Sequence, residues 1–284
     1  PTEWPTMQIV DRSVDDDWPN SLVSSALVAE IRDHSRRVAL IYNTKGRAKL
    51  VACAACKSLA RCSTCNGAMN ITSDSLFECG RCKETRPQVC LSCSAGKFAV
   101  LKPGISRLRE EIARAAGRKT DDVVEISGKP KDAVDVSKML FIGTESLIHR
   151  LKDVDTVVFL DIDQELSAPR YRASEIASTL LIGAARLVSR SSSEGRVLVQ
   201  TFNAQNPLLK AISNKKIDAY IASESASRIA MRMPPFSSLA QISGAAAPNV
   251  VALLQDQSGI SVSAENQGTF LIRSESWQHL STAL

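Results

Sequence analysis

The sequence predicts an α/β protein that carries a metal-binding insertion and ends in a smaller α+β domain. Apolar runs that are continuous, not alternating, are separated by segments with helical spacing, the pattern of a parallel sheet covered on both faces. All eight cysteines fall between residues 53 and 93, in four C-x-x-C pairs. Beyond residue 203 the runs become shorter and alternate, which indicates a small domain of another kind.

The α/β part begins with helical spacing at 21–34. Further helices are expected at 106–117, where Gly117 ends an amphipathic pattern, and at 172–190. Strands are expected at 37–43, 122–127, 139–143, 156–161 and 196–201. Because the cysteines interrupt this pattern after the first strand, we expect them to form an insertion in a surface loop of the α/β lobe.

The segment "FNAQNP" at 202–207 marks the expected boundary with the C-terminal domain. Beyond it we expect helices at 218–233 and 248–255, with strands near 238–243, 259–263 and 268–273. The predicted division has four segments: the start of the α/β lobe at 1–50, the inserted module at 51–98, the remainder of the lobe at 99–203 and the α+β domain at 204–284.

Composition and charge are those of a soluble globular protein. With 284 residues, 44% hydrophobic and 23% charged, the chain is long enough to bury one or two cores. The formal net charge of +5 permits nucleic-acid binding without requiring it. No apolar run reaches the roughly 18 to 20 residues that span a bilayer, and the acidic start lacks the apolar segment of a signal peptide. Because the chain starts at Pro1, we expect it to be a piece of a longer protein that makes no membrane contact.

The clustering of the cysteines favours zinc. Disulfides need an oxidising compartment and are usually spread along a chain, and a redox C-x-x-C normally occurs singly at the start of a helix. Two C-x-x-C turns together complete a tetrahedral S₄ zinc site with Zn–S near ~2.3 Å. Because His34, His149 and His279 lie outside the cluster, we expect two structural zinc ions held by cysteine alone. Iron or an iron–sulfur cluster is the remaining alternative.

Two ways of pairing the thiolates are open. Sequential pairing puts Cys53, Cys56, Cys62 and Cys65 on one ion, with only five residues between the two turns. Nested pairing puts Cys62, Cys65, Cys79 and Cys82 on an inner ion over a 13-residue hairpin, and Cys53, Cys56, Cys90 and Cys93 on an outer ion. We favour nesting because it relieves the tight spacing. Such a module buries little apolar area, so metal binding is expected to supply most of its folding free energy.

Basic residues decorate the predicted module: Lys57, Arg61, Arg81, Lys83, Arg86 and Lys97. One interpretation is that they offset the negative charge of two S₄ sites. The other is that they form a contact surface for nucleic acid or for an acidic peptide. A second basic group, interpreted as phosphate contacts or as a solvated helix face, comprises Arg107, Arg109, Arg114, Arg118 and Lys119.

Motifs of catalysis are sparse. The sequence has no GxxxxGK[ST] phosphate loop, no GxGxxG and no arguable nucleophile constellation. "LDIDQEL" places Asp161, Asp163 and Glu165 at alternate positions after a predicted strand, at the edge of an α/β sheet where ligands bind. We interpret these carboxylates as a Mg²⁺ site or, preferably, as solvated or helix-capping groups. His149 is expected to be packed or solvated.

Taken in order, several segments resemble the C-terminal half of the PriA family of replication-restart proteins, from about Val10 to Phe236. "LIYNTKGRA" (40–48) is similar to the family's N-R-R-G-Y segment, and the eight cysteines follow it as in the family's zinc-binding insertion. "FIGTE" (141–145) resembles the family's I-G-T-Q segment, and "LDIDQELSAPRYRASE" (160–175) its D-x-x-L-x-x-P-D-F-R-A-x-E segment. Further matches are "GRVLVQT" (195–201), Glu224, Arg228 and "PPF" (234–236).

The resemblance implies a RecA-like second helicase lobe that carries the two-zinc insertion in nested pairing and is followed by a small α+β domain. It also implies a cytoplasmic, nucleoid-associated bacterial protein that binds branched forks and single-stranded DNA and helps reload the replicative helicase. The implied partners are single-stranded-DNA-binding protein and the machinery that loads the helicase.

The chain departs from the family where ATP is handled. The family's Q-V-A-G-R-A-G-R segment has two arginines three residues apart, whereas "IGAARLVSR" has Arg186 and Arg190 four apart. A slip of one residue turns a side chain by about 100° on a helix, and an arginine finger is worth ~10³ to 10⁵ in turnover. We therefore assign no catalytic residue and treat Arg186 and Arg190 as a degenerate nucleotide site. In this respect the chain resembles the actinobacterial, non-helicase form of the family.

Three functions remain compatible with the sequence. The leading hypothesis is a restart protein without ATP-driven unwinding of its own. The alternative is an active ATP-dependent 3′-5′ DNA helicase whose nucleotide-binding lobe lies upstream of residue 1. The third is a zinc-ribbon protein that only bridges protein partners.

Overall fold

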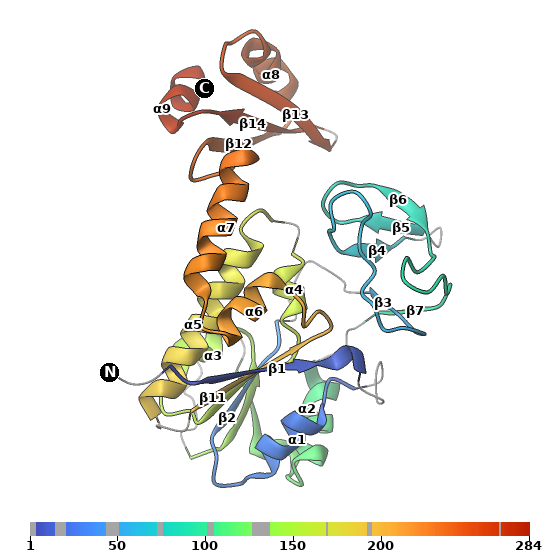
Figure 1. The fold of residues 1–284 in the computed structure, drawn as a ribbon, viewed down its shortest axis with the longest axis vertical. Coiled ribbons are helices and arrows are strands. Elements are labelled where there is room, and N and C mark those ends of the chain that lie inside the picture. The colour runs from blue at the N-terminus through green and yellow to red at the C-terminus, as the bar shows by residue number, and fades with distance from the viewer. Residues whose placement is uncertain are drawn as a thin grey trace. The chain divides into compact units, whose positions relative to one another are not determined.

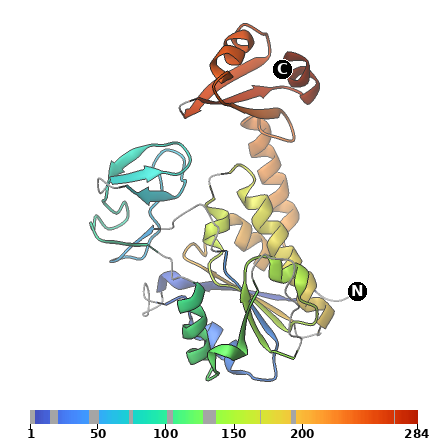
Figure 2. The same ribbon diagram turned by 180° about the vertical axis from the view of Figure 1, so that it is seen from behind.

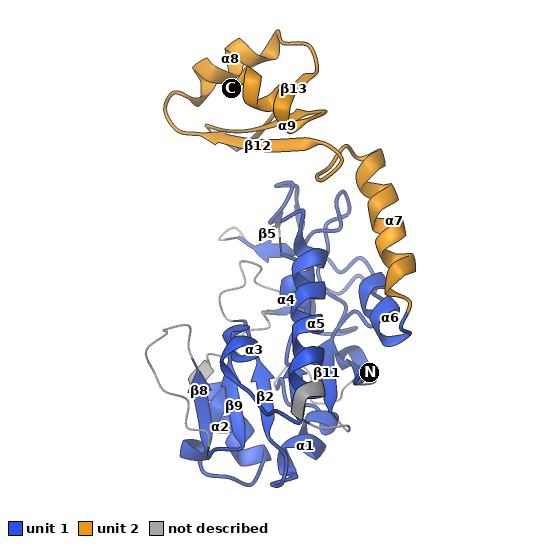
Figure 3. Ribbon diagram, turned by 90° about the vertical axis from the view of Figure 1, so that its left-hand side faces the viewer, with its two compact units in different colours: residues 1–215 blue, residues 216–284 orange. Residues whose placement is uncertain are grey.

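The computed structural model describes the following ranges: 4–14, 21–43, 51–72, 76–100, 105–126, 137–168, 170–191, 195–266 and 268–284. The chain divides into two compact units, residues 1–215 and residues 216–284 (Figure 3). The first unit contains the large sheet and the cysteine-rich module, and the second contains a smaller sheet. No helix in the described ranges is long and apolar enough to cross a membrane.

A parallel sheet forms the centre of the first unit. Within the described ranges it has six strands in the order β1-β11-β10-β2-β9-β8, and every neighbouring pair is parallel. The strands are β1 (Thr6–Asp11), β2 (Val38–Ile41), β8 (Val123–Ile126), β9 (Leu140–Gly143), β10 (Thr156–Phe159) and β11 (Arg196–Thr201). The four residues of β2, β9 and β10 are all buried, because helices cover both faces of the sheet. The prediction of an α/β protein with a parallel sheet is confirmed.

Strand β1 was not expected from the sequence. It pairs with β11 and its residues alternate between exposed and partly buried over its first half. Polar residues at Thr6 and Gln8 break the continuous apolar run that marked the other strands. An edge strand of this kind therefore lacks the signal on which the sequence prediction depended.

Helices lie on both faces of the sheet (Figures 1 and 2). On one face, α1 (Ser25–Arg32) and α2 (Ile105–Ala115) bury Leu27, Ile31, Leu108 and Ile112 in a cluster that also contains Leu40. The hydroxyl of Ser24 caps α1 by accepting a 3.1 Å hydrogen bond from the backbone N–H of Leu27. On the other face, α3 (Ser146–Arg150) and the long α5 (Ala173–Ser191) pack against β9, β10 and β11.

Shorter elements complete the lobe at the ends of its strands. They are η1 (Arg12–Val14), η2 (Thr120–Asp122), α4 (Asp163–Leu166) and α6 (Pro207–Ser213). Helix α6 packs against β1 and begins with Asn206, whose side chain accepts a 3.0 Å hydrogen bond from Leu208 N.

The cysteine-rich module is inserted between β2 and α2. It has a two-stranded antiparallel sheet of β3 (Val51–Cys53) and β7 (Phe98–Val100), where the chain enters and leaves. A three-stranded antiparallel sheet of β4 (Met69–Ile71), β5 (Leu76–Cys79) and β6 (Thr85–Pro87) lies between them in the sequence. These short strands are the hairpins that the cysteine spacing predicted.

The second unit is α+β, as expected. It contains α7 (Ile217–Ala230), β12 (Ser238–Ser243), α8 (Ala247–Gln255), β13 (Ile260–Asn266), β14 (Thr269–Ser274) and α9 (Trp277–Ala283). The strands form an antiparallel sheet in the order β12-β14-β13. Leu254 of α8, Ile272 of β14 and Leu280 of α9 make its core. Helix α9 was not expected, although Ser276 caps it by accepting a 3.2 Å hydrogen bond from His279 N.

Candidate metal centres and the polar edge of the sheet

The structure gathers the eight thiols into two groups of four. One group contains Cys62, Cys65, Cys79 and Cys82, and the other Cys53, Cys56, Cys90 and Cys93. In the inner group the Sγ atoms of Cys62 and Cys82 lie 3.5 Å apart, and those of Cys65 and Cys79 lie 3.4 Å apart. In the outer group the two corresponding distances are 3.6 Å for Cys53–Cys93 and 3.5 Å for Cys56–Cys90. This membership is the nested arrangement, not the sequential one.

The geometry of both groups fits a tetrahedral metal ion. None of the eight cysteines forms a disulfide, and the four sulfurs of each group all lie within 4.8 Å of one another. A regular tetrahedron with metal–sulfur distances of ~2.3 Å has edges of ~3.8 Å, close to these separations. Backbone N–H groups also point at sulfur: Thr64 N lies 3.4 Å from Cys62 Sγ, and Arg81 N lies 3.3 Å from Cys79 Sγ. Such donors stabilise thiolates, the form in which cysteine binds metal.

All four C-x-x-C pairs adopt the same local turn. The residue after the second cysteine donates its N–H to the carbonyl of the first cysteine, over 2.9–3.2 Å. That residue has a left-handed backbone in every case: Lys57 (φ 62°), Asn66 (φ 56°), Lys83 (φ 63°) and Ser94 (φ 59°). None of the four is glycine, so each turn carries a local conformational penalty that the closed metal site must hold in place.

A small apolar core supports the inner group. Met69 and Phe77 are fully buried beside Cys62 and Cys79. The ring of Phe77 meets Phe98 edge-on at 4.7 Å, and the guanidinium of Arg86 lies 4.9 Å above it. A Cβ atom at Gly67 would lie 3.1 Å from Cys79 Sγ, so a small residue is needed where the backbone passes the sulfurs. The module therefore has a core, but one far smaller than that of the lobe.

The carboxyl ends of the lobe's strands carry a buried polar network. Asp163, at the start of α4 beyond β10, is fully buried. Its carboxylate accepts hydrogen bonds of 2.9 and 3.0 Å from Thr201 Oγ1 and one of 2.6 Å from Phe202 N, both at the end of β11. Burial raises the pKa of Asp163, and these hydrogen bonds and the charge of Arg61 oppose the shift. The side chain therefore ties two neighbouring strand ends together.

Asp161 lies two residues earlier in the same network. Its Oδ2 atom accepts a 2.8 Å hydrogen bond from Gln164 Nε2. Burial, and secondarily the charge of Asp163, raise the pKa of Asp161 to about 7. Burial and the charge of Asp161 likewise raise the pKa of Tyr42, just beyond β2, to about 12.

Glu165 makes a third link across this edge. Its Oε1 atom accepts a 2.8 Å hydrogen bond from Asn43 Nδ2, while Asn43 Oδ1 accepts a 2.9 Å bond from the backbone N–H of Glu145. Arg170 pairs with the other carboxylate oxygen of Glu165. The expectation of solvated or helix-capping carboxylates was wrong, because all three are buried and bond to protein donors. Nor are they among the clusters suited to a metal ion in the described ranges, which are the two cysteine groups.

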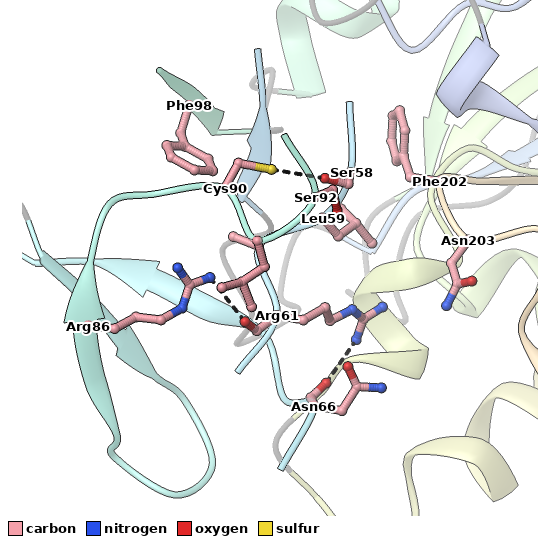
Figure 4. Close-up of a pocket in the computed structure, with 12 residues that line it drawn as sticks. Ser58, Leu59, Arg61, Asn66, Arg86, Cys90, Ser92, Phe98, Phe202 and Asn203 are labelled. Atoms are coloured by element: carbon pink, nitrogen blue, oxygen red, sulfur yellow. Dashed lines mark hydrogen bonds between the residues drawn. The ribbon is translucent and has the colours of Figure 1, made fainter. Parts of the chain in front are cut away.

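The module rests on this same edge through a small apolar contact. Phe202, the residue after β11, clusters with Ala52, Ala68 and Leu59 of the module. A cavity of about 300 Å³ opens beside this contact and is lined from both sides, by Arg61, Asn66 and Leu59 of the module and by Phe202 and Asn203 of the lobe (Figure 4). Burial lowers the pKa of Arg61, and the Asp163 carboxylate opposes that shift.

Comparison with known proteins identifies the chain's relatives, although no protein-family model matches it. It is 23% identical over 257 residues to the replication restart protein PriA of Synechocystis sp., covering 83% of this chain and 31% of the relative. It is 24% identical over 232 residues to the PriA protein of Haemophilus influenzae, covering 76% and 32% of the two chains. It is 25% identical over 273 residues to that of Rickettsia conorii, covering 89% and 42%.

The chain belongs to the PriA family. It corresponds to the C-terminal region of PriA and spans between 31% and 42% of the length of these three relatives. The resemblance predicted from ordered motifs is thus confirmed.

The basic residues of this PriA-family module have different surroundings. Arg86 is committed to the module, since its Nη1 donates a 2.6 Å bond to Val89 O and its Nη2 a 3.1 Å bond to Arg61 O. Lys83 pairs with Glu78 at 3.1 Å, whereas Arg81 and Lys97 are exposed and Lys57 is half-buried. Arg61 points into the cavity (Figure 4).

The second basic group and the degenerate nucleotide site lie on the lobe. Arg109 is structural, because its guanidinium donates to the carbonyls of Thr120 and Val123. Arg107 and Arg114 on α2 are exposed. Arg186 is exposed on α5, while the side chain of Arg190 lies outside the described part. His149 is exposed at the end of α3.

Phe202, Asn203, Tyr42 and Gln164 were not singled out from the sequence as site residues. Each directly follows a strand of the sheet or belongs to the turn after one, where α/β proteins bind ligands. That position was the available signal.

Proposed function

We propose that this chain is the C-terminal part of a bacterial replication-restart protein that binds branched and single-stranded DNA and helps reload the replicative helicase. In this proposal the parallel sheet is a RecA-like second helicase lobe, residues 51–98 are an inserted two-zinc module, and residues 204–284 include a C-terminal domain for assembly. Single-stranded-DNA-binding protein and the helicase-loading machinery are the proposed partners. The protein acts in the cytoplasm, at the nucleoid.

One observation carries the proposal. Two complete Cys₄ groups are inserted between β2 and α2 of a parallel sheet, in a chain whose relatives are named replication restart protein PriA. Four thiolates from C-x-x-C turns are the donor set that zinc prefers, and a closed site leaves no position for a catalytic water. Zinc bound at Cys53, Cys56, Cys90 and Cys93 and at Cys62, Cys65, Cys79 and Cys82 would therefore shape a surface instead of performing chemistry.

Motor activity is not part of the proposal. Arg186 and Arg190 are four residues apart on α5, so one turn of the helix cannot present both at the three-residue spacing of the family's arginines. The C-terminal edge of the lobe is also occupied by carboxylates that bond to one another's neighbours and not to solvent. A protein that retains the scaffold and lacks turnover fits these features best.

The first experiment is DNA-stimulated ATP hydrolysis by the full-length protein, with forked and single-stranded DNA. Turnover at background, together with binding of a labelled fork, is the expected result. Robust turnover would mean that Arg186 or Arg190 reaches the nucleotide and that the protein is a helicase. Failure to bind the fork at physiological salt would favour a module that only bridges proteins.

Matched variants locate the DNA contacts. Replacing Arg81 and Lys97 with alanine removes two exposed charges from the module, and we expect binding to weaken and the salt dependence to fall by about two phosphate contacts. Replacing Arg107 and Arg114 removes the same charge from α2 and serves as the control. Equal effects of the two pairs would mean that net charge alone, not the module, governs binding.

A further inference from the structure

The cavity between the module and the lobe contains hydrogen-bond donors that the described part of the chain does not use. The hydrogen bond from the Arg61 guanidinium within these ranges runs from Nη1 to Asn66 O and is long, at 3.4 Å. A guanidinium has five N–H donors in a fixed planar fork. The fork of Arg61 therefore faces the cavity with most of its donors available (Figure 4).

Amide and apolar side chains complete the cavity around this fork. The side chains of Asn66 and Asn203 line it from the module and from the lobe, so each side supplies a donor and an acceptor in one planar group. Leu59 and Phe98 give it apolar walls, and Leu91, 64% exposed, lies at its lining. Its volume of about 300 Å³ is at the lower end for ligand sites, which run from about 300 to 1,000 Å³.

We propose that this cavity holds one unstacked base of a single DNA strand, with guanine preferred. The proposal rests on the proposed function, because it assumes that the protein binds single-stranded DNA, and it names where one nucleotide is recognised. Arg61 would donate two hydrogen bonds to O6 and N7 of guanine, the commonest specific contact between arginine and a base. Asn66 and Asn203 would bond to the remaining polar edge, and Leu59 and Leu91 would cover the ring faces.

A neutral base suits the site better than a phosphate group. The Asp163 carboxylate lies close enough to Arg61 to affect it electrostatically, without a hydrogen bond between them. The charge of Arg61 is thus partly balanced, and a second anion in the cavity would face that buried carboxylate. Base acceptors use the donors of the fork without adding charge. Sequence-specific readers of single strands hold splayed bases in the same manner, by hydrogen bonds to their edges.

The test measures binding of fluorescein-labelled thymine tracts that contain one guanine, one adenine or one abasic position. With the full-length protein loaded with metal, the tract with guanine is expected to bind on the order of tenfold more tightly than the abasic tract. Arg61→Ala and, independently, Asn203→Ala should remove that difference. Asn203 lies on the lobe, so this second variant leaves the cysteines and their neighbours intact, and metal content checks that both variants retain their fold.

Arg81→Ala is the matched control, because Arg81 is exposed on the same module and does not line the cavity. It should weaken binding of all tracts alike and preserve the preference for guanine. Equal affinities of wild-type protein for the three tracts would overturn the base site while leaving the proposed function standing. A preference that survives Arg61→Ala would also overturn it. Failure to bind any tract at low salt would instead reject the proposed function, and the base site with it.

Discussion

The sulfurs of Cys53 and Cys93 lie 3.6 Å apart although the two residues are separated by 40 positions in the sequence. Cys53 ends β3, and Cys93 precedes β7, the strand with which β3 pairs. The outer group of thiols therefore fastens the base of the insertion, next to the two strands through which the chain leaves the lobe and returns. The inner group lies within the loop that the outer one closes.

This nesting predicts that the two sites can be emptied separately. Cys62→Ser removes one ligand of the inner site, so we expect the metal content to fall from two ions to about one for each chain. The inner hairpin should lose its order, because its apolar core is small and metal binding supplies most of its folding free energy. The parallel sheet should remain folded, since its core lies elsewhere. Metal analysis together with hydrogen exchange over 51–98 measures both effects.

Cys93→Ser provides the comparison for the outer site. It should also release about one ion, but protection should be lost first at β3 and β7, with the inner hairpin retained. Loss of both ions from either variant would contradict independent sites. Loss of protection in β2, β9 and β10 would contradict the view that the module is an insertion supported by its own metals.

A second prediction concerns the seat of the module on the lobe. Phe202→Ala removes the ring that packs against Ala52, Ala68 and Leu59. Removing a buried phenylalanine ring costs up to about 3–5 kcal/mol in protein cores, and here the loss should fall on the contact between module and lobe. We expect faster proteolysis at the ends of the insertion, with two metal ions still bound. Leu91→Ala, at a 64% exposed position beside the same cavity, should leave the cleavage rate unchanged.

Much of this architecture could be predicted from the sequence because its signals are local. The runs at 37–43, 139–143, 156–161 and 196–201 are apolar throughout, as strands buried on both faces must be, and each contains one of the observed strands. The cysteine spacing constrained the metal groups in the same local way. Strand β1 was missed because an edge strand needs only one buried face and its sequence alternates.

The polar edge could not be predicted, since it depends on contacts between distant strands. Asp163 looks like a solvated acid in the sequence, yet Thr201 and Phe202, 38 and 39 residues further on, supply its hydrogen bonds. The cavity depends in turn on where the module meets Phe202 and Asn203. No pattern of spacing along the chain encodes that meeting.

The raised pKa of Asp161 predicts an unusual dependence of stability on pH. Its pKa is about 7 in the folded chain, against an ordinary value of 3.8, because the carboxyl is buried near Asp163. Between these two values the folded state holds a proton that the unfolded state has released. The contribution of Asp161 to the free energy of unfolding should therefore be fully present below about pH 4 and be lost as the pH rises to about 7, with a slope of at most about 1.4 kcal/mol per pH unit.

Asp161→Asn isolates this contribution. The amide keeps the shape and can still accept a hydrogen bond from Gln164, but it cannot ionise. Urea unfolding at a series of pH values should show the difference between the variant and the wild-type protein growing from pH 4 to 7 in favour of the variant. A constant difference across that range would show that Asp161 titrates normally and that the carboxyl is not held in a buried, acid-rich network.

The fourth prediction uses the left-handed residues of the cysteine turns. Ser94 has φ 59° and directly follows Cys93, so a side chain there opposes the turn that presents the outer thiolates. A left-handed residue with a Cβ costs roughly 1–2 kcal/mol relative to its preferred conformation, and glycine avoids this at an added entropy cost in the unfolded chain of about 0.4–1 kcal/mol. Ser94→Gly should therefore stabilise the metal-loaded module by roughly 0.5–1 kcal/mol and slow the release of metal to a chelator. Ser92→Gly lies in the same turn at a position without positive φ and should instead speed release. If both substitutions speed release, the backbone at Ser94 is not strained, and the four turns hold their thiolates without a conformational cost.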